Sequence, residues 1–129
     1  MTNALKIETL PYFFAIAKIR NPASINWKSP FVFVGKTDDE LSLVALESEV
    51  PSDAYPVDRG YRMMRVAGTL DMSLTGILAR ISKVLADEEI PIFAVSTYNT
   101  DYILVKSHTF KNAVQALSRA GYLVTNEIS

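Results

Sequence analysis

The feature that most constrains the fold of this chain is an internal similarity at a shift of 61 residues. The shift brings the segment 30–34, PFVFV, onto 91–95, PIFAV, and brings 41–44, LSLV, onto 102–105, YILV. A Gly-Tyr pair that ends at residue 61 recurs at residue 122 with the same shift. In both copies two short apolar runs flank a polar turn, which is typical of a β-hairpin. The sequence therefore predicts the duplication of one small unit that contains a hairpin.

The second copy has a complete set of elements around its hairpin. A strand is expected over 61–68, and an amphipathic helix over 75–89, where apolar residues recur on one helical face. A second helix is expected over 109–120, with Gly121 at its C-terminal end, and a last strand over 122–125. The order strand-helix-strand-strand-helix-strand is the ferredoxin-like βαββαβ pattern. The predicted fold class is α+β, with antiparallel strands and both helices on one face of the sheet.

The first copy is less regular than the second. Pro22, Pro51 and Pro56 fall where the repeat would place helices, and a proline inside a helix removes a backbone donor and clashes with the preceding turn. This half is expected to form short helical turns at most. We therefore predict a degenerate first unit over 1–60 and a more complete second unit over 61–129. The strand expected over 61–68 could serve both units, as the last strand of the first and the first strand of the second.

Charge and composition exclude several classes of function. The chain has 13 basic and 14 acidic residues, so it lacks the basic excess of a nucleic-acid-binding protein. It has no cysteine, which excludes disulfides and thiolate catalysis, and its single histidine argues against a transition-metal site. The apolar stretch 10–19 is too short to cross a bilayer, and the N-terminus shows no signal-peptide pattern. We expect a cytoplasmic protein with no cofactor, no metal, no nucleic-acid partner and no membrane partner.

The sequence contains no catalytic motif that we recognise: no glycine-rich phosphate loop, no serine elbow and no paired histidines on a helix. His108 is expected to be an exposed loop residue. The acidic run 38–40 is expected to form a solvated turn, because consecutive residues on a hairpin do not converge on a cation. Trp27 is expected to cover the apolar core of the first half. We predict that the protein is not an enzyme.

Several segments resemble a known family. The segments 60–62 (GYR), 66–68 (VAG), 74–78 (LTGIL) and 92–105 (IFAVSTYNTDYILV) look like the second half of small bacterial tandem ACT-domain proteins. The segment 37–42 (TDDELS) resembles the hairpin of their first half. The same block is similar to the regulatory region of aspartate kinases and to the cytosolic arginine sensors. The resemblance implies tandem ACT units that bind an amino acid at an interface between units, within a side-by-side homodimer.

The resemblance also implies where the ligand lies. In the family the ligand lies between the loop that enters the first helix and the hairpin of a neighbouring unit, which correspond here to 71–77 and 97–101. The candidate ligand-binding residues are therefore Asp71, Leu74, Thr75, Gly76, Ile77, Thr97, Tyr98, Thr100 and Asp101.

The helix start also has a chemical reason of its own to bind a ligand. Backbone N–H groups in the first turn of a helix lack intrahelical partners, and the helix dipole is positive there, so a carboxylate is favoured near Gly76. Asp101, with Asp71 as a further candidate, could face an ammonium group, and the hairpin threonines could donate hydroxyl hydrogen bonds. The alternative is structural: Gly76 allows close packing, Thr75 caps the helix and Asp101 shapes the turn.

Two functions from different classes are consistent with these observations. The first is an amino-acid-responsive regulatory protein, whose ligand stabilises an assembly and with it the contact to a regulated protein partner. The alternative is a dimerisation or protein-interaction module with no functional ligand site.

Overall fold

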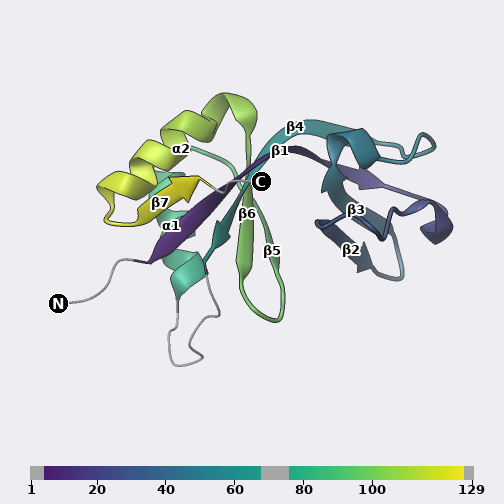
Figure 1. Ribbon diagram of the computed structural model, residues 1–129, viewed down its shortest axis with the longest axis horizontal. Helices are drawn as coiled ribbons and strands as arrows, with labels where there is room; N and C mark the ends of the chain where they lie inside the picture. Colours follow the sequence, from purple (N-terminus) through teal and green to yellow (C-terminus); the bar gives the residue numbers. More distant parts are fainter. Residues whose placement is uncertain (1–4, 68–75, 127–129) are drawn as a thin grey trace. The chain divides into compact units, whose positions relative to one another are not determined.

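The computed structural model describes residues 5–67 and 76–126 of the chain. Within these ranges it contains two α-helices and seven strands, together with the short 3-10 turns η1 and η2 (Figure 1). In chain order the elements are β1 Lys6–Lys18, η1 Pro22–Ser24, β2 Val32–Lys36, β3 Leu41–Leu46, η2 Glu47–Glu49, β4 Val57–Val66, α1 Ile77–Asp87, β5 Phe93–Ser96, β6 Asp101–Lys106, α2 Ser107–Arg119 and β7 Leu123–Asn126.

Packing divides the described residues into two compact units. Tyr12–Tyr61 form one, which we call the hairpin unit. The described residues on both sides of this segment form the other, which we call the helical unit because it contains α1 and α2. The strands β1 and β4 each contribute residues to both units. Residues 61–66 of the strand expected over 61–68 are thus the later part of a longer strand, β4, which begins at Val57 and ends at Val66.

The helical unit follows the expected βαββαβ order of elements, from β4 to β7. Its strands are hydrogen-bonded in the order β7-β1-β4-β6-β5, and the hairpin of β5 and β6 is antiparallel as expected. However, β1 lies between β4 and β7 and runs parallel to β7, with pairs from Lys6↔Leu123 to Thr9↔Asn126. The expectation of a wholly antiparallel sheet is therefore wrong at this pair. Hydrophobic periodicity reports which face of a strand is buried, and it does not report which strand lies beside it.

Both helices pack on one face of this sheet and share one core with it (Figure 1). α1 lies within the predicted range and buries the apolar face expected of it. α2 begins at Ser107, two residues before the predicted start, so His108 is exposed in the first helical turn and does not lie in a loop as expected. The buried residues of the core are Ile7, Met64, Val66, Ile77, Ile81, Leu85, Ile90, Ile103, Val105, Ala113 and Leu117.

Helix α2 ends as its sequence predicts. Gly121 has φ 102°, in the left-handed region that glycine adopts without steric cost. Its N–H donates to the carbonyl of Ser118 at 3.1 Å, and the N–H of Tyr122 donates to the carbonyl of Leu117 at 3.1 Å. These two bonds form a Schellman motif, which satisfies the last carbonyls of the helix and turns the chain into β7.

The hairpin unit has no α-helix among its described residues. Its strands follow the order β2-β3-β1-β4, and one cluster of its buried residues consists of Ile19, Ile25, Leu43 and Ala45. Trp27 does not cover this core as expected, because its side chain is 65% exposed. η2 begins with nearly the same backbone angles as α2, since Leu46 has φ −56° and ψ 140° and Lys106 has φ −61° and ψ 145°. η2 ends at Glu49, two residues before Pro51, which agrees with the prediction that prolines interrupt helices in this half.

The two hairpins match in structure at a shift of 60 residues and not at the 61 taken from the sequence. The N–H of Thr37 donates to the carbonyl of Glu40 at 2.9 Å, and the N–H of Thr97 donates to that of Thr100 at 2.8 Å. β3 and β6 also share one burial pattern, with their third to fifth residues buried. The hydrogen-bonded turn sets the register, and a slip of one residue would reverse the two faces of each strand. A pair of tandem ACT-like units, divided near residue 60, stays a proposal.

Candidate functional site

The chain topology brings two of the predicted ligand-binding segments to one end of the helical unit. β4 ends at Val66, α1 begins at Ile77, and the turn between β5 and β6 lies at the same end as the start of α1 (Figure 1). One hydrogen bond joins two of these parts directly, because the Thr100 hydroxyl donates to the carbonyl of Val66 at 2.7 Å. The turn is therefore fixed beside the point where the chain leaves the sheet for α1.

The start of α1 is built on a glycine in a left-handed conformation. Gly76 is the N-cap residue, with φ 72°, and its carbonyl accepts the first helical hydrogen bond from the N–H of Arg80 at 2.9 Å. No side chain in the described part of the chain caps this helix. A Cβ atom at Gly76 would lie 3.3 Å from Nη1 of Arg80, so the guanidinium lies beside the helix start. Ile77 is only 5% exposed, which leaves its backbone and not its side chain for a ligand.

The turn between β5 and β6 is held by its own side chains. The Thr97 hydroxyl donates to the carbonyl of Thr100 at 3.0 Å, and the Ser96 hydroxyl donates to Oδ1 of Asp101 at 2.6 Å. Thr100 is only 6% exposed, and its hydroxyl proton is donated to the carbonyl of Val66. The hydroxyl can therefore only accept a hydrogen bond from a ligand. Thr97 and Tyr98 are exposed, and Asp101 is half-buried as a residue. The turn thus presents one carboxylate and exposed polar groups on a fixed backbone.

Six of the nine predicted site residues lie within the described part of the chain, and three lie outside it. Gly76 and Ile77 lie at the end of the unit that also carries Thr97, Tyr98, Thr100 and Asp101. The predicted residues Asp71, Leu74 and Thr75 lie outside the described residues. Two neighbours of the site were not foreseen from the sequence, namely Arg80 beside the helix start and Ser96 on the Asp101 carboxylate. The helical period places Arg80 one turn after Gly76, and strand pairing places Ser96 opposite Asp101.

Two arginines on β4 have structural partners on opposite faces of the strand. The guanidinium of Arg62 lies 4.2 Å from the ring centre of Phe110 in α2 and donates to the carbonyl of Leu10 at 3.0 Å. Burial lowers the pKa of Arg62. Arg65 forms an ion pair with Glu8 at 3.0 Å. The two side chains therefore do not converge on one anion.

Within 5–67 and 76–126, the side chains form no group of three or more acidic or histidine residues that could hold a metal ion. No helix in these ranges has the length and apolar character needed to cross a membrane.

Comparison with known proteins agrees with the order of elements in the helical unit. Residues 57–119, from the start of β4 to the end of α2, match the family model of the ACT domain. The segment from β4 to α2 is therefore ACT-like. Protein Atu0741 from Agobacterium tumefaciens has 30% sequence identity to this chain, and its X-ray structure has a TM-score of 0.87 to this structure. The match covers 99% of this chain and 97% of that chain. The chain therefore belongs to the same family as that protein.

Two further solved structures share the fold of this chain at low identity. The regulatory subunit of aspartate kinase from Thermus thermophilus has a TM-score of 0.68 at 9% identity, over 92% of this chain and 99% of that chain. A Vibrio cholerae protein of unknown function has a TM-score of 0.71 at 15% identity, over 90% of this chain and 89% of that chain. No curated protein matches the sequence. The predicted ACT-like fold is confirmed, whereas the tandem arrangement and the relation to arginine sensors stay predictions.

Proposed function

We propose that the protein is a non-catalytic regulatory protein that binds an amino acid between ACT units of a homodimer, near the start of α1. The observation that carries this proposal is that the α1 start and the β5–β6 turn lie at one end of an ACT domain, where the turn is hydrogen-bonded to the end of β4 (Figure 1). The structural likeness to the regulatory subunit of an aspartate kinase supports a regulatory role. Ligand binding would stabilise the dimer and so its contact with a regulated protein partner in the cytoplasm.

The chemistry of this end of the unit suits a zwitterion. The first-turn N–H groups of α1 and the positive end of the helix dipole favour a carboxylate, and Gly76 has no side chain to obstruct it. The Asp101 carboxylate supplies the opposite charge for an ammonium group. Thr97 and Tyr98 add exposed polar groups to the same turn. In this proposal the two charged ends of one amino acid are held by the helix start of one unit and the turn of a neighbouring unit.

A thermal-shift screen of the twenty amino acids tests the proposal. An amino acid present at 100 times its dissociation constant should raise the free energy of unfolding by about 2.7 kcal/mol. Asp101→Asn keeps an acceptor for the Ser96 hydroxyl but removes the charge, so it should abolish the response without unfolding the protein. Asp39→Asn, in the turn of the other hairpin, is the matched control and should respond like the wild type.

The outcomes separate the two functional hypotheses. If no amino acid shifts the melting temperature at millimolar concentration while light scattering shows a dimer, the alternative of a dimerisation or interaction module is favoured. If Asp101→Asn responds like the wild type, the ligand does not lie at the β5–β6 turn.

A further inference from the structure

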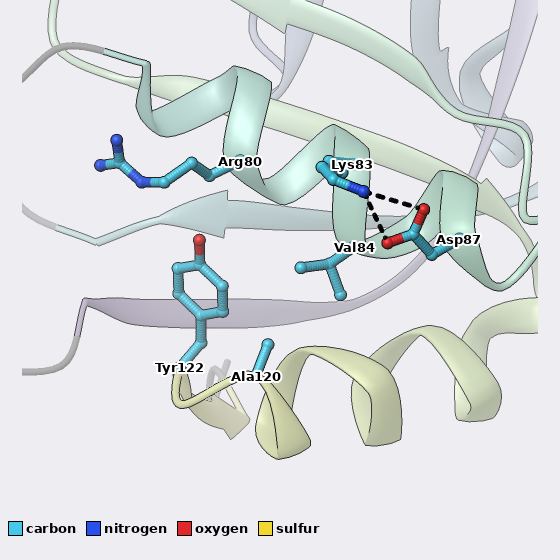
Figure 2. A pocket seen from close by; sticks show the side chains of 6 residues that line it. All are labelled: Arg80, Lys83, Val84, Asp87, Ala120 and Tyr122. Atoms are coloured by element: carbon cyan, nitrogen blue, oxygen red, sulfur yellow. Dashed lines mark hydrogen bonds and ion pairs between the residues drawn. The ribbon is translucent and has the colours of Figure 1, made fainter.

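The two units differ in what covers one face of their strands. In the helical unit α1 and α2 form a covering layer, and Figure 2 shows the groove that remains between α1 and the connection from α2 to β7. The corresponding face of the hairpin unit carries the buried cluster that contains Leu43, the counterpart of Ile103 at the shift of 60. No α-helix among the described residues of this unit covers that cluster. Two loops cover it, 20–29 and 47–56, and we call their outer surface the loop face.

The two loops of the loop face lie side by side within the hairpin unit. Ile25 of the first loop is buried in the cluster, and Ala54 of the second loop packs against it. The loops are also joined directly, because Nδ2 of Asn26 donates a hydrogen bond to Oε2 of Glu49 at 3.2 Å. The loop face is therefore one continuous surface of a single unit.

Two large aromatic side chains of the loop face are exposed to water. Trp27 is 65% exposed and Tyr55 is 79% exposed. Tryptophan side chains are highly buried on average in folded proteins. Tryptophan and tyrosine are also the residue types that most often anchor the centre of a protein–protein interface. The loop face therefore exposes side chains that are typical of an interface.

The charges of the loop face are divided between its two loops. The first loop has two basic residues and no acidic one, whereas the second has three acidic residues and no basic one. These charged residues are Arg20 and Lys28 in the first loop, and Glu47, Glu49 and Asp53 in the second. Arg20, Lys28 and Asp53 are exposed, and their side chains form no ion pair within 5–67 and 76–126. A basic loop thus lies beside an acidic loop.

A surface of this kind is complementary to itself about a two-fold axis. In a two-fold symmetric contact, residue i of one copy meets residue j of the other, and residue j of the first meets residue i of the second. The basic loop of each copy then lies against the acidic loop of the other copy, so opposite charges meet at both contacts.

We propose that the loop face is an interface between two copies of this chain, in which each basic loop contacts the acidic loop of the other copy. Trp27 and Tyr55 are buried in this contact. The interface goes beyond the ACT–ACT interface proposed above and does not depend on it, because all of its residues belong to the hairpin unit.

The size of the loop face sets the expected strength of the contact. A standard interface takes about 20–30 residues from each side and buries about 800 Å² on each partner. The two loops together have 20 residues, so the contact lies at the lower end of this range. We therefore expect a dissociation constant of about 1–100 µM.

The fluorescence of Trp27 measures this association directly, because the chain has no other tryptophan. In the full chain, the emission should move to shorter wavelength as the protein concentration rises through the dissociation constant. Quenching by acrylamide should fall over the same concentrations, because the contact removes the indole ring from water. Emission and quenching that stay constant up to about 1 mM, tenfold above the expected range, would overturn the proposal.

Reversal of single charges tests the two-fold arrangement. Lys28→Glu and Asp53→Lys should each weaken the association about tenfold, because the two-fold axis repeats each change at two contacts. An equimolar mixture of the two variants should associate more strongly than either variant alone, because opposite charges face each other again in the mixed pair. A mixture that associates no more strongly than its separate components would refute the complementarity of the two loops.

Matched variants outside the loop face serve as controls. Asp39→Lys reverses an exposed charge elsewhere in the hairpin unit, and Leu123→Ser removes an exposed apolar side chain from the helical unit. Both variants should keep the concentration-dependent emission of the wild type. If Asp39→Lys weakens the association as much as Asp53→Lys does, net charge and not the loop face governs it, and the proposal fails.

The contribution of Trp27 itself is measured by sedimentation velocity. Trp27→Ser changes an exposed side chain and should weaken the association at least about tenfold, as expected for an aromatic anchor. Association of Trp27→Ser with the affinity of the wild type would place the contact elsewhere. A negative amino-acid screen would refute the ACT–ACT ligand site alone and would leave these results intact.

Discussion

The hydrogen bond from Thr100 to Val66 allows a quantitative test of how the turn is attached to β4. The donor–acceptor distance is 2.7 Å, Thr100 is 6% exposed and Val66 is fully buried. Thr100→Val keeps the shape of the side chain and removes the donor. A buried polar group that loses its partner costs about 1–3 kcal/mol. In a chain of this size that loss corresponds to a fall in melting temperature of roughly 3–15 °C.

Urea unfolding followed by circular dichroism measures this loss directly. Thr100→Ser keeps the hydroxyl and should be clearly more stable than Thr100→Val, although it loses a methyl group. Thr97→Val removes an exposed hydroxyl from the same turn and should cost less than the buried change. If Thr100→Val lies within about 0.5 kcal/mol of the wild type, the range of neutral surface changes, the bond does not stabilise the turn. Equal losses for Thr100→Val and Thr100→Ser would assign the effect to packing and refute the hydrogen-bond argument.

Two other perturbations follow from backbone geometry and from burial. Gly121→Ala should cost about 1 kcal/mol in urea unfolding because φ is 102°, whereas Gly35→Ala, where φ is not positive and an added Cβ also meets no atom within 4 Å, should be near neutral. Equal effects of the two changes would remove the conformational explanation. Burial, with a hydrogen bond to Asp58, raises the pKa of Tyr61 from 10.0 to about 12. The stabilisation from its protonated form is therefore complete below pH 10 and lost between pH 10 and about 12, so Tyr61→Phe should lack that loss in unfolding curves across this range. An unchanged alkaline profile in Tyr61→Phe would contradict this assignment.

The local pattern predicted the elements of the helical unit well. The apolar period correctly predicted one buried face of α1, which carries Ile77, Ile81 and Leu85, and Gly121 correctly marked the end of α2. Helix periodicity and the C-terminal glycine act over a few residues, so they can be read from the sequence alone. The start of α2 was placed two residues late because Ser107 and His108 carry no apolar signal.

The candidate site was predicted in outline only. The resemblance selected the helix start and the turn, and the topology brings these two segments to one end of the unit. The hydrogen bond from the Thr100 hydroxyl to the carbonyl of Val66 could not be predicted, because the two residues are 34 positions apart in the chain. The position of the Arg80 guanidinium beside Gly76 depends on a rotamer, which a sequence does not specify.

The repeated hairpins and the βαββαβ order were therefore determined by the sequence itself, since each depends on short-range periodicity, turn residues and helix ends. Tertiary structure alone decided three further features. It inserted β1 between β4 and β7, it fixed the relation between the two hairpins at 60 residues in place of 61, and it left Trp27 exposed. Each of these depends on which distant segment supplies a hydrogen-bond partner or a covering surface. A repeat of apolar and polar residues defines a buried face, but the segment that covers that face is chosen only when the whole chain packs.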